Sequence, residues 1–158
     1  MIVDLKTLKK ILKNIRRENK KIVFTNGCFD LIHIGHIEIL RKAKKKGDIL
    51  IVGLNSDSSV RKIKGNKRPI LNERDRAKIL DSIKYVDYVV LFNEKTPYKL
   101  IKEIKPDVLV KGADYKIDEV VGSDIVLKKK GEVFLVPLVK GKSTTKLIEK
   151  ILALYGRD

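Results

Sequence analysis

Residues 22–36 have the sequence IVFTNGCFDLIHIGH, and the prediction of the fold starts from them. Its first residues are apolar and mostly β-branched, which is typical of a buried β-strand, and Asn26-Gly27 then marks a turn. An amphipathic helical pattern begins near Gly35. The sequence therefore predicts a strand, a turn and the start of a helix, in that order.

A junction of this kind is suited to binding phosphate groups. The first turn of a helix has N–H groups without intrahelical partners and a partial positive charge. Gly27 and Gly35 leave room for backbone or ligand to approach closely. His33 and His36 are the only histidines in the chain, and both fall at this junction, three residues apart. Their rings could therefore face the same ligand, although an isolated H-x-x-H pattern is as often a pair of surface or core residues.

Composition limits the class of protein. A chain of 158 residues is expected to form one domain, and 43% hydrophobic with 35% charged residues is typical of a globular protein. The single cysteine, Cys28, cannot form an intramolecular disulfide, which favours a reducing compartment. No apolar run approaches the roughly 20 residues of a membrane helix, and the N-terminus lacks a signal-peptide core. We therefore expect a cytoplasmic protein with no membrane association.

The formal net charge of +16 makes nucleic acid a partner to consider. The excess is mostly lysine on predicted helical segments, without the aromatic residues of a base-stacking surface. We therefore do not expect nucleic acid to be the main partner, and a non-catalytic nucleotide- or RNA-binding module is kept as an alternative. The same positive field would attract ATP and a sugar phosphate, which are both anionic.

Strands and helices are expected to alternate along the chain. An amphipathic helix capped by Asp4 is expected within residues 1–20, with a role in packing or oligomer contact, and the main domain then covers 21–158. Apolar runs predict strands at 22–25, 49–54, 88–92, 108–110 and 133–136. The alternation predicts a single α/β domain with a parallel sheet and helices on both faces.

The connecting segments have helical patterns with recognisable ends. Helices are expected from Gly35 to Gly47, near 58–63, after Asn72, after a Thr96-Pro97 cap and over 120–130. Ser143 is the expected cap of a final helix whose inward residues are Leu147, Ile148, Ile151 and Leu152.

Seven pieces occur in order along the chain: TNGCFDLIHIGH, NSDSSVRKIKG, RPI, ERDRAKIL, YVDYVVLF, PDVLVKGADY and GKSTT. H-x-G-H after a strand and a glycine turn resembles the signature of the nucleotidyltransferase superfamily, whose Rossmann-like enzymes join a nucleotide monophosphate to a phosphate-bearing acceptor and release pyrophosphate. Together the pieces resemble the heptose 1-phosphate adenylyltransferase family over residues 21–152. The resemblance implies a five-stranded parallel sheet in the order 3-2-1-4-5, with ligands bound where the first and fourth strands meet.

The resemblance also implies a reaction. AMP would pass from ATP to D-glycero-D-manno-heptose 1-phosphate, giving ADP-heptose for surface polysaccharide and releasing pyrophosphate. Because the attacking phosphate is already an anion, the protein has to position it and neutralise developing charge, without a general base. Mg²⁺ is expected to be carried mainly by the ATP phosphates, with no protein metal ligands. The bound triphosphate is expected to favour protonated histidines over the opposing helix N-terminus.

The residues that the resemblance assigns fall into three groups. The catalytic group contains His33, His36, Lys64 and Arg76. The nucleotide-binding group contains Thr25, Asn26, Gly27, Cys28, Phe29, His33, Gly35, His36, Lys111, Ser143 and Thr144. The acceptor-binding group contains Asp30, Lys62 and Asp114.

Some alternatives stay open. Asp30 is equally compatible with binding the acceptor sugar and with ordering its loop, and Cys28 fits loop packing better than a nucleophilic role. GKS at 141–143 is not the end of a P-loop, because Val136 stands where the first glycine is required. The alternative within the same class of enzyme is a cytidylyl- or adenylyltransferase that acts on another phosphorylated acceptor, such as glycerol 3-phosphate or FMN. A homodimer is compatible with the resemblance, and the chain has no room for the kinase of the bifunctional relatives, so a separate upstream kinase is expected.

Overall fold

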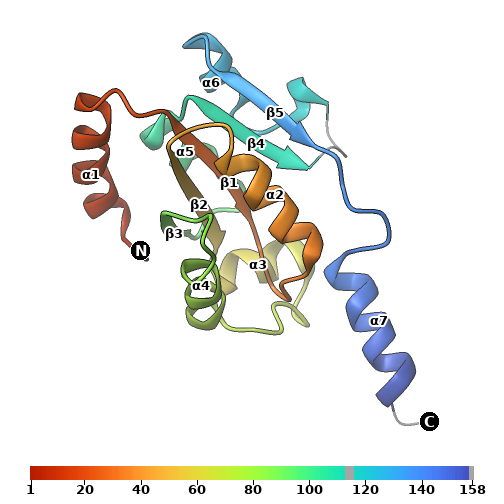
Figure 1. Ribbon diagram of the computed structural model, residues 1–158. Helices are drawn as coiled ribbons and strands as arrows, with labels where there is room; N and C mark the ends of the chain where they lie inside the picture. The colour runs from red at the N-terminus through yellow and green to blue at the C-terminus, as the bar shows by residue number, and fades with distance from the viewer. Residues whose placement is uncertain (113–115, 157–158) are drawn as a thin grey trace.

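The computed structural model describes residues 1–112 and 116–156 and contains a five-stranded sheet (Figure 1). The strands are β1 (Ile22–Gly27), β2 (Ile49–Asn55), β3 (Tyr88–Phe92), β4 (Val108–Gly112) and β5 (Glu132–Val136). All neighbouring strands are parallel, and their order is β3-β2-β1-β4-β5. The expected single α/β domain and its strand order are confirmed.

Helices connect the strands on both faces of the sheet (Figure 1). They are α1 (Leu5–Arg17), α2 (Ile34–Lys44), α3 (Asp57–Lys64), α4 (Glu73–Asp81), α5 (Tyr98–Ile104), α6 (Ser123–Lys128) and α7 (Thr144–Tyr155), with a short 3₁₀ helix, η1 (Ile117–Glu119). Asp4, Asn72 and Ser143 cap α1, α4 and α7 as expected, because each side chain accepts a hydrogen bond from a first-turn N–H.

Alternating side chains of the strands form two hydrophobic cores. Phe24 lies in a core with residues of α1, α5 and α6, whereas Val23 lies on the other face with residues of α2 and α4. The buried residues of α1 are Leu8, Leu12 and Ile15, and they belong to the core that contains Phe24. The N-terminal helix is therefore packed on the sheet and is part of the same core as the main domain.

Two helix boundaries differ from the expected ones. The N-cap of α5 is Pro97, with no side-chain cap hydrogen bond, so Thr96 does not cap this helix. The predicted helix over 120–130 is shorter, because Gly122 has a left-handed backbone (φ 87°) and α6 begins only after it. Both differences come from backbone turns that hydrophobic periodicity does not report.

The expected burial of α7 is wrong. Its apolar side chains share one side of the helix, yet none of its residues is buried, and Leu152 is 63% exposed. In Figure 1 the helix extends away from the sheet after the segment that follows β5. Periodicity identifies the apolar face of a helix, but whether the rest of the chain covers that face depends on where the preceding segment leads.

The order of the strands creates a site beyond the carboxyl ends of the central strands. β1 pairs with β2 on one side and with β4 on the other, so the chain leaves the centre of the sheet in opposite directions. In an open parallel sheet, ligands bind beyond the carboxyl ends of the strands at this reversal. The segment after β1, which carries both histidines, lies at this place.

Candidate active site

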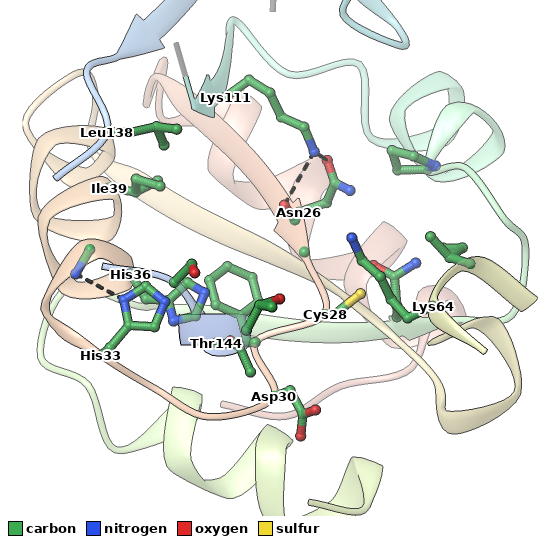
Figure 2. Close-up of a pocket in the computed structure, with 18 of the residues that line it drawn as sticks. Asn26, Cys28, Asp30, His33, His36, Ile39, Lys64, Lys111, Leu138 and Thr144 are labelled. Carbon is green, nitrogen blue, oxygen red and sulfur yellow. Dashed lines mark hydrogen bonds between the residues drawn. The ribbon is translucent and has the colours of Figure 1, made fainter. Parts of the chain in front are cut away.

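A pocket of about 560 Å³ lies beyond the carboxyl ends of β1 and β4 (Figure 2). Its size is typical of sites for small molecules. Most of the residues that the sequence assigns to the site line this pocket: Asn26, Gly27, Cys28, Phe29, Asp30, His33, Gly35, His36, Lys64, Lys111, Ser143 and Thr144. The segments that carry them come from four separate parts of the chain.

His33 is both a pocket residue and the N-cap of α2. Its Nδ1 accepts a hydrogen bond from the N–H of Gly35 at 3.1 Å, so the neutral ring carries its proton on Nε2. Burial, followed by the charge of Lys142, lowers the pKa of His33. The cap therefore fixes one edge of the ring and leaves Nε2 as a hydrogen-bond donor.

His36 lies against His33 and deeper in the protein. The two rings stack with centroids 3.9 Å apart and an interplanar angle of 26°, and the ring of Phe29 lies 5.2 Å from that of His36. His36 Nδ1 is buried and has no hydrogen-bond partner among the described residues. Burial, followed by the neighbouring His33, lowers the pKa of His36 to about 4. The ligand-free ring is therefore neutral at pH 7.

The N-termini of α2 and α7 meet at this side of the pocket. Ser143 caps α7 by accepting from the N–H of Lys146, and the Thr144 hydroxyl contacts the Leu31 carbonyl at 3.5 Å. Gly35, in the first turn of α2, has no room for a side chain, because a Cβ there would lie 2.9 Å from the His33 ring. Two helix N-termini and the adjacent Lys142 give this side a positive field suited to phosphate oxygens.

Lys111 and Cys28 lie at other walls of the pocket (Figure 2). Lys111 Nζ donates to the Asn26 side-chain oxygen at 3.0 Å, which ties the end of β4 to the end of β1. Burial raises the pKa of the Cys28 thiol, although the nearby cations oppose this shift. Cys28 is therefore a protonated thiol at neutral pH, consistent with packing in the loop.

Arg76 was expected to bind phosphate, but the structure places it away from the pocket surface. Its side chain is fully buried, and it does not line the pocket. The guanidinium donates to the carbonyls of Leu71, Cys28 and Asn55 and forms an ion pair with Asp57 at 2.7 Å. Arg76 thus joins α4 to the segments after β1 and β2 and supports the pocket from behind.

Asp30, in the loop between β1 and α2, is engaged with the loop between α3 and α4. Its fully buried carboxylate accepts from the N–H groups of Ile70 and Leu71 and from Arg68 Nε, at 2.6 to 2.9 Å. Burial opposes ionisation, but these donors outweigh it and lower the pKa of Asp30. Of the two roles left open by the sequence, this geometry favours ordering the loop.

Two further assigned residues are outside the pocket wall, and a third is not described by the structure. Thr25 is buried and its hydroxyl donates to the Val110 carbonyl at 3.0 Å, which links β1 to β4. Lys62 is exposed and does not line the pocket. Asp114 lies outside the described residues.

The pocket also contains residues that the sequence assignment missed. Among them, Arg68, Lys95 and Lys142 are cationic, and Glu119 is acidic. Arg68 begins the RPI piece and Lys142 lies within GKSTT, so the motifs contained both without indicating their function. Lys95 follows β3, and only the sheet order brings it to the site.

Residues 1–112 and 116–156 contain no group of three or more His, Cys, Asp or Glu side chains that could hold a metal ion. No helix within the same residues has the length and apolar character needed to cross a membrane.

The fold and the histidine pair at the β1–α2 junction define a Rossmann-like nucleotidyltransferase. The model of the cytidylyltransferase-like family matches residues 24–150, and the chain belongs to this family. Bifunctional protein HldE of Geobacter metallireducens is 53% identical over 99% of this chain and 32% of its own length. For Bifunctional protein HldE of Nitratiruptor sp. the identity is 55%, over 95% of this chain and 32% of the relative. The chain therefore spans about a third of the length of these curated relatives.

Solved structures with the same fold include a related protein and a more distant one. The lipopolysaccharide core biosynthesis protein from Thermoplasma volcanium is 34% identical, with a TM-score of 0.62 over 78% of this chain and 99% of that protein. Pantoate-beta-alanine ligase from Francisella tularensis, solved in complex with beta-gamma ATP and beta-alanine, has a TM-score of 0.65 at 19% identity over 100% of this chain and 80% of the ligase. The second similarity concerns the fold alone.

Proposed function

We propose that the protein transfers AMP from ATP to D-glycero-D-manno-heptose 1-phosphate and releases pyrophosphate. The observation that supports this most is the stacked pair of His33 and His36 in a positively charged pocket, next to the N-termini of two helices. The sequence pieces that resemble the heptose family support the acceptor. The name of the related T. volcanium protein, which refers to lipopolysaccharide core biosynthesis, supports the same kind of product.

In the proposed reaction, an oxygen of the sugar phosphate attacks the α-phosphorus of ATP. The bond between this phosphorus and the oxygen that bridges to the β-phosphate breaks, and pyrophosphate leaves. Because the nucleophile is an anion, no proton has to be removed from it. The protein contributes by holding the two anions in line and by donating hydrogen bonds to oxygens on which charge develops.

Different residues are proposed to contact different phosphate groups. His33 Nε2 is available to donate to a phosphate oxygen because its Nδ1 is already used in the cap of α2. The N–H groups at the N-termini of α2 and α7 add donors that need no protonation. ATP is proposed to bind as its magnesium complex, with the metal carried by the phosphates. Lys64 and Lys111 supply charge on other walls of the pocket.

The acceptor requires a preceding reaction. A sugar 1-phosphate is made by phosphorylating the anomeric position of the sugar, so a kinase activity must supply it. The nucleotide-activated heptose is then suited to glycosyl transfer, because the nucleotide is a good leaving group.

Pyrophosphate release tests the proposed reaction. ATP and CTP are each paired with heptose 1-phosphate, glycerol 3-phosphate and FMN in the presence of Mg²⁺. We expect release with ATP and heptose 1-phosphate, and a loss of about 10²-fold or more in kcat for His36→Ala. Lys45→Ala, which changes an exposed residue at the end of the same helix, is the matched control and should leave kcat unchanged. Release with a different pair would contradict the proposed nucleotide or the proposed acceptor. If no pair releases pyrophosphate, transfer to heptose 1-phosphate, glycerol 3-phosphate and FMN is contradicted.

A further inference from the structure

We propose that Arg68 binds the phosphate group of the acceptor, and that this phosphate lies on the side of the pocket away from the histidine pair. The inference rests on the proposed function, because it assigns one of the two anions of that reaction to a place. Arg68 lies between α3 and α4 and lines the pocket.

One edge of the Arg68 side chain is fixed by a buried anchor. Its Nε donates to Asp30 Oδ2 at 2.6 Å, and the Asp30 side chain is fully buried. The N–H groups of Ile70 and Leu71 hold the other carboxylate oxygen, Asp30 Oδ1, at 2.8 and 2.9 Å. The carboxylate is therefore held from three directions and cannot turn toward a ligand, so Arg68 is attached to a rigid point.

The other end of Arg68 is available for a ligand. Its two terminal amino groups form no hydrogen bond with any described residue, and the side chain is only 16% exposed. Arginine presents its donors in a planar fork that matches the oxygens of a phosphate group. A guanidinium that is already oriented and largely shielded from water loses less entropy and competes with less solvent when it binds an anion.

Apart from Lys95, the cations of the pocket lie on two sides. Cys28 lies in the field of Lys64, Arg68 and Lys111, whereas the pocket lysine that acts on His33 is Lys142. In Figure 2, Lys64 and Cys28 lie on the opposite side of the view from His33 and His36. On the first side Lys111 contacts Asn26 at the end of β1, and on the second Lys142 directly precedes Ser143, the N-cap of α7.

Positive charge on two sides of the pocket suits a reaction in which two anions, ATP and the acceptor phosphate, bind at the same time. The triphosphate, whose leaving group carries most of the charge, fits the side with the histidines and two helix N-termini. The acceptor phosphate then fits the group around Arg68. Because Asp30 balances the charge of Arg68, Lys64 and Lys111 supply the net positive charge there, and Arg68 supplies the planar fork of donors.

Steady-state kinetics distinguish this role from a general loss of charge. We expect Arg68→Gln to raise the KM for heptose 1-phosphate at least tenfold while the KM for ATP changes less than twofold. Arg68→Lys keeps the charge but lacks the fork, and should raise the acceptor KM by nearly as much. Lys67→Gln is the matched control, because Lys67 is exposed in the same loop and does not line the pocket. Equal effects of Arg68→Gln on both KM values, or none on either, would overturn the proposal.

A binding measurement that does not need turnover separates this proposal from the proposed function. α,β-Methylene ATP with Mg²⁺ fills the nucleotide site, and inorganic phosphate is then titrated by calorimetry. The wild type and Lys67→Gln should bind phosphate alike, and Arg68→Gln should bind it at least tenfold more weakly while keeping its affinity for the ATP analogue. Absence of phosphate binding to the wild type, or equal binding to Arg68→Gln, would overturn the proposal. Binding through Arg68 without turnover of heptose 1-phosphate would contradict only the proposed acceptor.

Discussion

The imidazole rings of His33 and His36 stack with their centroids 3.9 Å apart, and the pKa of each ring is lowered. Two rings in such contact cannot both become charged without strong repulsion unless an anion lies beside them. The ligand-free pair is therefore neutral near pH 7. A bound triphosphate provides the compensating charge, so binding of ATP and protonation of the pair are expected to favour each other.

This coupling is measurable by NMR titration of the imidazole protons. Without ligand, His36 should titrate near pH 4 because it is buried and lies next to His33. Saturation with α,β-methylene ATP and Mg²⁺ should raise its midpoint by more than one pH unit. An ordinary midpoint near 6.5 in the ligand-free protein, or no change with the nucleotide, would contradict the coupling.

The same pKa predicts how stability depends on pH. His36 has a pKa of about 4 in the folded protein and of roughly 6.5 when unfolded, so the unfolded chain binds the proton more tightly. The contribution of the neutral ring is fully present above pH 6.5 and is lost as the pH falls through 4. We expect ligand-free wild type to lose about 2–3 kcal/mol more than His36→Asn between pH 7 and pH 4, measured by urea unfolding. Parallel curves for the two proteins would contradict this.

Arg76 is predicted to act on stability through its buried contacts. Arg76→Met removes the partner of Asp57 and leaves three carbonyl groups without their donor. We expect a loss of about 3–5 kcal/mol in the free energy of unfolding, measured by urea denaturation. Arg74→Met, at an exposed position of the same helix, should cost less than about 0.5 kcal/mol. Similar small losses in both variants would show that the Arg76 contacts are weak.

Gly35 is predicted to control the position of His33. In Gly35→Ala, the new Cβ would lie 2.9 Å from Cε1 and 3.0 Å from Nδ1 of His33, so the ring has to move from its cap position. The helix preference of alanine offsets the lost cap, and stability should change by less than about 1 kcal/mol. Steady-state assays should nevertheless show at least a tenfold lower kcat. Ile34→Ala, at a half-exposed position of the same turn, is the control, and an equal loss in both variants would contradict this role.

The exposed face of α7 gives a contrasting prediction. Leu152 is 63% exposed, so Leu152→Ala should change the free energy of unfolding by less than about 0.5 kcal/mol. Leu40 is fully buried on α2, and Leu40→Ala should cost about 2–5 kcal/mol. Urea unfolding of both variants measures the difference. A cost for Leu152→Ala near that for Leu40→Ala would contradict the exposed position of α7.

The sequence predicted the sheet because strands covered on both faces, such as β2, are short continuous apolar runs, a pattern typical of buried parallel strands. It predicted the histidine junction because β1, the turn and the start of α2 are consecutive in the chain. It could not predict the setting of Arg76, whose carbonyl partners Cys28, Asn55 and Leu71 come from three separate segments. The sequence also could not predict that α7 is exposed. The pattern of apolar residues on one face of a helix is the same whether or not another segment covers that face.

Phosphorus NMR of a reaction with MgATP and heptose 1-phosphate follows the proposed transfer of AMP to a sugar phosphate without any coupled enzyme. We expect the loss of the ATP signals and the appearance of free pyrophosphate together with the two coupled phosphorus signals of ADP-heptose. AMP with pyrophosphate would show that water takes the nucleotide, and ADP without pyrophosphate would show transfer of the γ-phosphate. Either of these results would contradict the account.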